Sequence, residues 1–341
     1  MSARPDNRKL KALSQERPLL EVRGLRVLFR DVSTGRMIHA VDDATFDVPR
    51  NTFVGLTGES GSGKTTIALS LMGLGKGVPG VVAGAVRFDG RLVYDAKPLG
   101  RLSPLARARR LDRAVAPLRG RDLFMIFQEP RASLNPYWKI GAQLAECLHR
   151  NNNGLSREQA TDQMKSLLAG VWLPPSVLGV YPAELSTGMC QRIMIAMALA
   201  MGVKLLVADE PLSRIDLRLR RKVVTALEAI RANPAMPMAM LLSTHDLDLI
   251  KHLADMVIVM YKGRIIEIGP TPVVLGAASA HKHEYTARLL ATYNWVESAR
   301  EQIAADGVPK ALDAALLGRL RKQIPLGREM VEVEKGHWLR K

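Results

Sequence analysis

A glycine-rich stretch that ends in lysine and threonine carries the clearest chemistry of this chain. Residues 58–66 read GESGSGKTT and fit the pattern G-x-x-x-x-G-K-[ST]. The apolar run 53–57 before it is typical of a buried parallel strand, and residues 67–74 after it suit a helix packed on a sheet. Glycines leave backbone N–H groups free to converge on phosphate oxygens, and a helix N-terminus favours negative charge. Strand, loop and helix together predict a nucleoside triphosphate site rather than an ordinary glycine-rich turn.

Within this phosphate loop, Lys64 is expected to reach the β- and γ-phosphates and Thr65 to offer its hydroxyl to Mg²⁺. The expected nucleotide-binding residues of the loop are Gly58, Glu59, Ser60, Gly61, Ser62, Gly63, Lys64, Thr65 and Thr66.

Polar side chains end or follow three further predicted strands. Gln128 follows the run 122–127, Asp209 and Glu210 end the strand 205–210, and His245 lies at the polar tip of the strand 240–246. Ligands of open α/β sheets bind beyond the carboxyl ends of the strands, so we expect these side chains to meet the phosphate loop.

These residues suggest distinct roles in ATP hydrolysis. Oxygen ligands suit Mg²⁺, so we expect the metal at Thr65, Gln128 and Asp209. Glu210 is placed to polarise the water that attacks the γ-phosphate, and His245 to hydrogen-bond that phosphate. Gln128 could bridge metal and water. The candidate catalytic residues are therefore Glu210, His245 and Gln128.

One aromatic residue is a candidate for the nucleotide base. Phe29 lies at the end of the alternating run 19–29, which together with residues 41–48 predicts an antiparallel hairpin leading into the phosphate-loop strand. Phe29 could stack on the base, or it could simply cover the face of the sheet.

The remaining pattern predicts an α/β fold. Strands alternate with helices, which indicates a largely parallel sheet with helices on both faces. Residues 86–91 predict a hairpin that turns at Asp89-Gly90, and residues 131–182 predict a helical insert. Residues 185–200 predict a long apolar helix opened by a Ser-Thr-Gly sequence that suits an N-cap, and residues 256–269 predict a closing hairpin.

Composition limits the class of protein. The chain has 341 residues, is 47% hydrophobic and carries a formal net charge of +16, which suggests an anionic partner such as nucleic acid or a membrane face. Within the arginine-rich residues 101–121, four arginines have helical spacing: Arg107, Arg109, Arg110 and Arg113. They could contact nucleic acid or lipid head groups, but we expect them to form a solvated helix face. Cys147 and Cys190 lie far apart without a C-x-x-C motif, so we expect neither a disulfide framework nor a zinc site. The basic N-terminus has no apolar core of a secretory signal, and the apolar run 193–208 is too short to span a bilayer.

Taken in order, these motifs resemble the ATP-binding subunit of an ABC transporter. Residues 58–66 match Walker A, Gln128 the Q-loop, residues 205–210 Walker B, residues 213–216 the D-loop and His245 the switch histidine, while residues 185–189 (LSTGM) match the signature LSGGQ. The sequences FMIFQEPRASLNP and HKHEYTARLL resemble the peptide and nickel permease branch. The run IAMALAMGVKLLVADEP and Cys190 are also similar to the antimicrobial-peptide-sensitivity (Sap) subunits.

The resemblance implies the domain organisation. It places a P-loop NTPase cassette of α/β class over residues 19–270, with a mixed or parallel core sheet, an antiparallel β subdomain and an inserted helical subdomain at about 131–185. Residues 1–18 would be a basic N-terminal arm. Residues 271–341 would be a short C-terminal extension for regulation or docking, which lacks the cysteines that this branch often carries there. His281, His283 and Glu284 are expected to be solvated residues at a helix start rather than metal ligands.

The resemblance also implies partners. ATP and Mg²⁺ would bind, and a second ATP-binding subunit, expected to be a different chain, would place its signature over this chain's ATP. In the same way Ser186, Thr187 and Gly188 of this chain would cover the partner's ATP in trans. Two polytopic membrane subunits would dock on the helical insert, with an extracytoplasmic binding protein if the system is an importer. The chain would then lie peripherally on the cytoplasmic face of the inner membrane, and no nucleic acid is expected.

Two departures from the family pattern leave alternatives open. Thr187 replaces a signature glycine and adds bulk beside the phosphate, and Arg214 stands where the D-loop usually has a small residue. The leading interpretation is an ATPase that energises uptake of peptides or related small solutes. The alternatives are a soluble ABC-type ATPase acting on nucleic acid or ribosomes, and a weakly hydrolysing scaffold subunit of a heteromeric transporter.

Overall fold

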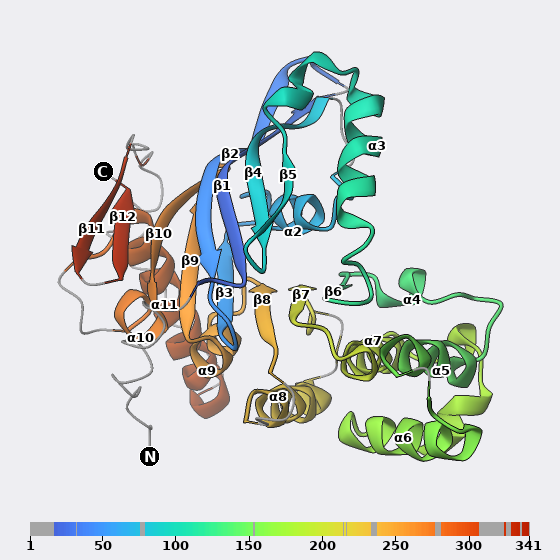
Figure 1. The fold of residues 1–341 in the computed structure, drawn as a ribbon. Helices are drawn as coiled ribbons and strands as arrows, with labels where there is room; N and C mark the ends of the chain where they lie inside the picture. Colours follow the sequence, from blue (N-terminus) through green and yellow to red (C-terminus); the bar gives the residue numbers. More distant parts are fainter. Residues whose placement is uncertain are drawn as a thin grey trace.

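The computed structural model shows a core built on a β-sheet, to which an antiparallel β subdomain, a helical insert and a C-terminal region are attached (Figure 1). It describes residues 17–31, 33–75, 79–152, 154–213, 215, 217–232, 237–276, 281–306, 324, 329–334 and 336–340. The expected N-terminal arm up to residue 16 and the D-loop residues Arg214 and Asp216 lie outside these described residues.

The central element is an eight-stranded sheet of order β11-β12-β10-β9-β3-β8-β7-β6. Its strands are β3 (Phe53–Gly58), β6 (Leu123–Ile126), β7 (Leu205–Asp209), β8 (Ala239–Ser243), β9 (Met256–Tyr261), β10 (Arg264–Pro270), β11 (Met330–Glu334) and β12 (His337–Arg340). Strands β6, β7, β8, β3 and β9 run parallel, whereas β10, β12 and β11 are added antiparallel. The predicted mixed core sheet and the closing β9–β10 hairpin are confirmed.

A second, four-stranded antiparallel sheet has the order β2-β1-β4-β5. It consists of β1 (Leu20–Arg30), β2 (Met37–Val48), β4 (Pro79–Phe88) and β5 (Arg91–Asp95). This confirms the predicted antiparallel subdomain and the hairpin that turns at Asp89-Gly90. Helix α3 (Pro104–Val115) packs against β4 and β5.

The strands of the core sheet are nearly all apolar because both faces are covered. Along β7 the side chains alternate: Leu205 and Val207 face the side covered by α2 (Lys64–Leu71) and the antiparallel sheet, whereas Leu206 and Ala208 face the helices on the other side. Those helices include α7 (Thr187–Met201), α8 (Leu217–Ala232) and α9 (Leu247–Leu253). Helix α2 therefore lies between the two sheets.

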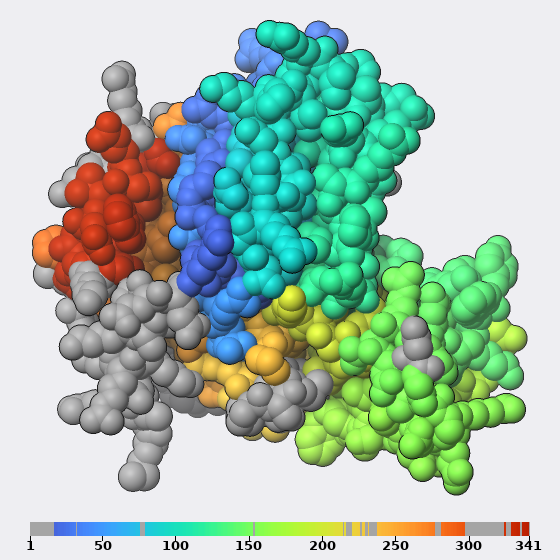
Figure 2. All heavy atoms as spheres, in the orientation of Figure 1, coloured from blue at the N-terminus to red at the C-terminus, as the bar shows by residue number. Residues whose placement is uncertain are grey.

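The helical insert projects beside the far edge strand β6 (Figure 1). Its helices are α4 (Pro130–Ser133), α5 (Ile140–Asn151) and α6 (Arg157–Gly170), and all three pack against α7. The turns η1 (Pro98–Arg101), η2 (Pro175–Gly179) and η3 (Pro182–Glu184) are 3-10 helices. Figure 2 shows the antiparallel subdomain in blue and teal and the helical insert in green as separate lobes with a notch between them.

The C-terminal region lies at the opposite side of the molecule from the helical insert (Figure 1). It contains α10 (Thr271–Val274), α11 (Glu284–Asp306) and the hairpin β11–β12. Strand β12 pairs with β10 through Glu267↔Leu339 and Ile268↔Trp338, so the end of the chain extends the core sheet. The sequence pattern alone did not indicate that these strands join the sheet.

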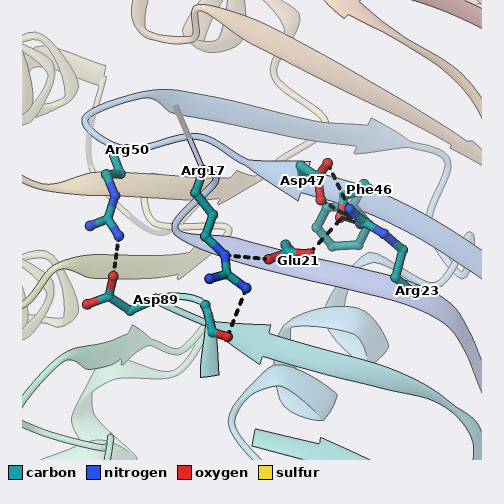
Figure 3. A network of polar contacts seen from close by, with 8 residues as sticks. Arg17, Glu21, Arg23, Phe46, Asp47, Arg50 and Asp89 are labelled. Atoms are coloured by element: carbon teal, nitrogen blue, oxygen red, sulfur yellow. Dashed lines mark hydrogen bonds and ion pairs between the residues drawn. The ribbon is translucent and has the colours of Figure 1, made fainter. Parts of the chain in front are cut away.

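Polar contacts tie the turns of the two sheets together (Figure 3). The carboxylate of Asp89, in the β4–β5 turn, pairs with Arg50, which precedes β3, and with Lys204, which precedes β7, at 3.1 Å. Its pKa is held below the usual value, chiefly by the hydrogen bond from Arg50 and then by that from Lys204. In the same view Arg17 donates to the carbonyl oxygen of Gly90.

No helix of the described part of the chain is both long enough and apolar enough to cross a membrane.

One arginine of α3 contradicts the expected solvated helix face. Arg109, Arg110 and Arg113 are exposed as predicted, but Arg107 is only 6% exposed. Its guanidinium donates at 3.2–3.4 Å to four carbonyl oxygens, those of Val81, Leu99, Gly100 and Leu102. Its helical spacing predicted that Arg107 would be exposed like Arg109, Arg110 and Arg113. Only the tertiary structure shows that these four carbonyl groups surround its guanidinium.

Replacing Arg107 therefore tests this packing. Arg107→Met keeps the aliphatic stem but removes a charged donor from four buried or partly buried carbonyl oxygens, so we expect it to lower the free energy of unfolding by about 2–4 kcal/mol. Arg109→Met on the same helix is the matched control and should change it by less than about 0.5 kcal/mol. Chemical denaturation of both variants measures the difference, and equal effects would contradict a structural role for Arg107.

Candidate functional site

The predicted polar residues converge at the carboxyl ends of four adjacent parallel strands. Strands β3, β8, β7 and β6 lie side by side in register, so the phosphate loop, His245, Glu210 and Gln128 emerge at one edge of the sheet. A cleft of about 540 Å³ opens there. Its lining residues are Ala40, Ser60, Gly61, Gly63, Lys64, Thr65, Thr66, Gln128, Glu210, Ser213 and His245. The prediction that these side chains meet is confirmed.

The shape of the phosphate loop depends on glycines. Gly58, Gly61 and Gly63 have positive φ angles of 146°, 77° and 106°, a region that other residues rarely adopt. A Cβ atom on Gly58 would lie 2.2 Å from the carbonyl oxygen of Met260, and one on Gly63 would lie 2.3 Å from that of Ala40. The loop therefore packs directly against the backbones of β9 and β2.

Lys64 closes the loop on itself. Its Nζ donates to the carbonyl oxygens of Gly58 at 2.7 Å and Glu59 at 2.9 Å. Burial lowers the pKa of Lys64, although the carboxylates of Glu210, Asp209 and Glu59 counteract the shift. The buried ammonium is thus short of solvation and suited to contact an anion.

Asp209 shows the complementary effect. It is buried at the end of β7, and its Oδ1 has no hydrogen-bond partner among the residues that the structure describes. Burial raises the pKa of Asp209 above its ordinary value, while the nearby hydroxyls of Ser243 and Thr65 act in the opposite direction. The Ser243 hydroxyl lies near the Asp209 carboxylate, but among the described residues it has no hydrogen-bond partner either. A cation near Oδ1 would satisfy this carboxylate.

Glu210 is held in a defined orientation by its neighbours. Its Oε1 accepts from His245 Nδ1 at 2.7 Å and from the His245 backbone N–H at 3.2 Å, and its Oε2 accepts from the Thr244 hydroxyl at 3.3 Å. The Glu210 side chain is 14% exposed, against 72% for His245.

The backbone at Glu210 also has an uncommon conformation. Its φ is +50°, which costs about 1–3 kcal/mol for a residue other than glycine. Two hydrogen bonds fix this conformation. The backbone N–H of Glu210 donates to the carbonyl oxygen of Ser243 at 2.8 Å, and the carbonyl oxygen of Glu210 accepts from the Ser213 hydroxyl at 2.9 Å. The surrounding strands therefore aim the carboxylate into the cleft.

Two predicted groups lie away from this cleft. Phe29 pairs with Ile38 and Pro79 in the antiparallel sheet and is half-buried against the core around α2. It is not among the residues lining the cleft. Ser186, Thr187 and Gly188 begin α7, where the Ser186 hydroxyl accepts from Met189 N–H at 3.2 Å and confirms the predicted N-cap.

Some residues of the site carried no recognisable signal in the sequence. Ala40 lines the cleft through its place on β2, and Thr244 contacts Glu210 from the polar tip of the β8 strand. Arg192 donates to the carbonyl oxygens of Gly188, Val171 and Trp172, and so fixes the first turn of α7 to the end of α6. These contacts arise from topology rather than from residue type.

The fold and site define a nucleotide-binding cassette of the P-loop ATPase class. The family model for the ABC transporter matches residues 41–213. A peptide import ATP-binding protein of Brucella ovis is 38% identical over 276 residues, covering 80% of this chain and 77% of that protein. The dipeptide transport ATP-binding protein DppD of Escherichia coli is 36% identical (84% and 82% covered), and the oligopeptide transport protein OppD of Haemophilus influenzae is 37% identical (74% and 72% covered).

A solved dimer of the ATP-binding cassette MJ0796, bound to ADP and Pi, has a TM-score of 0.61 at 20% sequence identity. It covers 74% of this chain and 98% of that one, and supports the fold. The chain belongs to the ABC transporter family as an ATP-binding subunit. It binds ATP, and its family hydrolyses ATP to drive transport.

The buried Asp209 gives a prediction for stability. The pKa of Asp209 is higher in the folded protein than its ordinary value of 3.8. The free energy of unfolding therefore falls as the pH rises from 3.8 through the folded pKa, and the loss persists at neutral pH. Asp209→Asn should therefore raise the free energy of unfolding at pH 7 by about 0.5–2 kcal/mol without nucleotide or Mg²⁺. This gain should disappear below pH ~3.8, where the carboxyl is neutral in both states. Denaturation of both proteins across pH measures it, and a less stable Asn variant at pH 7 would contradict the prediction.

Proposed function

We propose that this chain is the ATP-hydrolysing subunit of an importer for peptides or related small solutes. The observation that carries the proposal is the cleft in which Glu210, oriented by His245, faces the phosphate loop. The names of the relatives, which describe dipeptide, oligopeptide and peptide transport, supply the class of substrate.

The residues present fit a magnesium ion. Asp209 offers a buried carboxylate oxygen that has no partner within the described part of the chain, and Thr65 and Gln128, whose side chains carry oxygens, line the adjacent cleft. Hard cations take such oxygen ligands, and Mg²⁺ usually keeps several waters. When bound with ATP, the ion would neutralise charge that develops on the phosphates.

The protein side chains would then perform the remaining chemistry. Lys64 exchanges its two carbonyl partners for the β- and γ-phosphates, while the N–H groups of the loop bind phosphate oxygens. Glu210 orients and polarises the attacking water, and Gln128 contacts that water from its position after the neighbouring strand β6. His245 keeps Glu210 in place through Nδ1 and turns toward the γ-phosphate when ATP is bound.

The site would be completed by a second ATP-binding subunit, which we propose is a different chain. Residues 186–188 lie outside the cleft of their own phosphate loop, as expected for residues that act on a partner's ATP. Thr187 is half-buried beside the capped start of α7, so its side chain adds bulk at the position that would approach that ATP. The two composite sites of the assembly would therefore turn over ATP at different rates.

The membrane partners would be two polytopic subunits docked on the helical insert. The exposed aromatic side chains there include Tyr137, which is 86% exposed, Trp138 and Tyr181. Gln143 fixes the loop that carries Tyr137 through hydrogen bonds to the backbone of Asn135 and Trp138. Rigid exposed aromatics are typical anchors of protein interfaces. An extracytoplasmic protein would deliver the solute, and this chain would lie on the cytoplasmic face of the inner membrane.

Glu210 provides the direct test of hydrolysis. Glu210→Gln keeps the size and most hydrogen bonds but removes the base, so ATP turnover in the assembled transporter should fall by about 10²–10⁴-fold while ATP binding persists. Phosphate release and nucleotide binding measure the two effects. Turnover within a few-fold of wild type would refute the assigned role, and turnover that depends on RNA rather than on the membrane subunits would favour the nucleic-acid alternative.

Substitution of Thr187 tests whether the two composite sites turn over ATP at different rates. Thr187→Gly restores the small residue, so ATP turnover of the assembled heteromer should rise, by about twofold if the second site becomes as fast as the first. Thr187→Ser is the intermediate control, since it removes only the methyl group. Unchanged turnover in both variants would show that the threonine is tolerated.

A further inference from the structure

The C-terminal region contacts the phosphate loop directly. Tyr285, in the first turn of α11, accepts a hydrogen bond at its hydroxyl from the backbone N–H of Glu59 at 3.0 Å. The two residues are 226 positions apart in the chain. Tyr285 lies outside residues 41–213, which the family model matches, and none of the nucleotide-site motifs includes it.

The tyrosine is held rigidly in place. It is 3% exposed, and its ring stacks on that of Tyr261 with centroids 4.5 Å apart. Tyr261 ends β9, the strand that pairs with β3 up to Gly58. The following turn contacts the loop too, because Gly263 N–H donates to the carbonyl oxygen of Ser62 at 3.0 Å. The outer side of the phosphate loop is therefore supported by β9 and α11 together.

Buried hydrogen bonds connect Tyr285 to the end of the chain. The backbone N–H of Tyr285 donates to His283 Nδ1 at 3.1 Å, and the backbone N–H of His283 donates to Glu267 Oε2 at 3.1 Å. The other oxygen, Oε1 of Glu267, contacts His337 Nε2 on β12 at 2.7 Å. His283 is buried rather than solvated, contrary to the expectation from the sequence, and burial lowers its pKa.

Glu59 is thereby held from two sides. Lys64 donates to its carbonyl oxygen, and Tyr285 accepts from its N–H. When Lys64 moves to the phosphates of a bound nucleotide, the carbonyl of Glu59 loses that contact. The bond to Tyr285 does not involve Lys64 and can persist through this exchange.

We propose that Tyr285 is a positioning residue for ATP binding. The C-terminal region uses the Tyr285 hydroxyl at the start of α11 to hold the Glu59 peptide so that the other N–H groups of the loop remain directed at the phosphates. The C-terminal region is in this respect part of the nucleotide site, and a perturbation of it changes nucleotide affinity.

Tyr285→Phe removes this hydroxyl and keeps the stacked ring. One lost hydrogen bond between neutral groups corresponds to roughly a two- to tenfold change in an equilibrium constant. We expect the full-length variant to bind ATP–Mg²⁺ and ADP–Mg²⁺ about three- to tenfold more weakly. In the assembled transporter, the KM for ATP should rise by the same factor while kcat changes by less than about twofold. Titration with a fluorescent nucleotide and phosphate release measure these quantities.

Tyr261→Phe is the matched control, since it removes the hydroxyl of the other ring in the same stack and leaves the Tyr285–Glu59 bond in place. Its nucleotide affinity and KM should equal those of the wild type. Melting temperatures without nucleotide distinguish positioning from simple stabilisation. Wild-type or tighter nucleotide binding by Tyr285→Phe overturns the proposal, as does an equal loss in both variants. A lower melting temperature of Tyr285→Phe with unchanged affinity would likewise overturn it by assigning the hydroxyl to folding alone.

Discussion

The site depends on a single geometric constraint: opposite charges are buried where parallel strands end. The register of β3, β8, β7 and β6 fixes the phosphate loop, His245, Asp209 and Gln128 along one edge of the sheet. Covering both faces with apolar layers deprives Lys64 and Asp209 of water, which lowers the pKa of the first and raises that of the second. A nucleotide with its metal ion supplies the charges that both groups lack. The same packing that stabilises the sheet thus prepares the site for its ligand.

Much of this arrangement could be predicted because it follows from local patterns and one topological rule. The glycine pattern before Lys64 identified the loop, and the polar residues that end apolar runs identified Gln128, Asp209, Glu210 and His245. Parallel strands bring such ends together. The rule does not apply to Phe29, whose position depends on how an antiparallel hairpin lies on the core. The structure places it against that core rather than in the cleft.

The unpredicted features are long-range contacts between residue types that carry no signal of their own. Arg107 has the same spacing as its exposed neighbours, yet it is buried against the carbonyl oxygens of Leu99, Gly100 and Leu102, just before α3, and of Val81 in β4. His283 and His337 are buried against Glu267, although nothing in their sequence context separates them from solvated residues. The hairpin β11–β12 contributes to the core sheet from the far end of the chain. Such contacts require the tertiary structure, and one of them leads from the C-terminal region to the phosphate loop.

We propose that this chain is an ATPase subunit whose site is completed by a second ATP-binding subunit. The most direct measurement is phosphate release by the purified full-length chain, alone and after co-assembly with the proposed membrane subunits and the proposed second ATP-binding subunit. We expect Mg²⁺-dependent ATP turnover that is at least tenfold higher per subunit in the assembly than for the chain alone. Equal turnover in both samples, or turnover that needs nucleic acid instead of the membrane subunits, would contradict it.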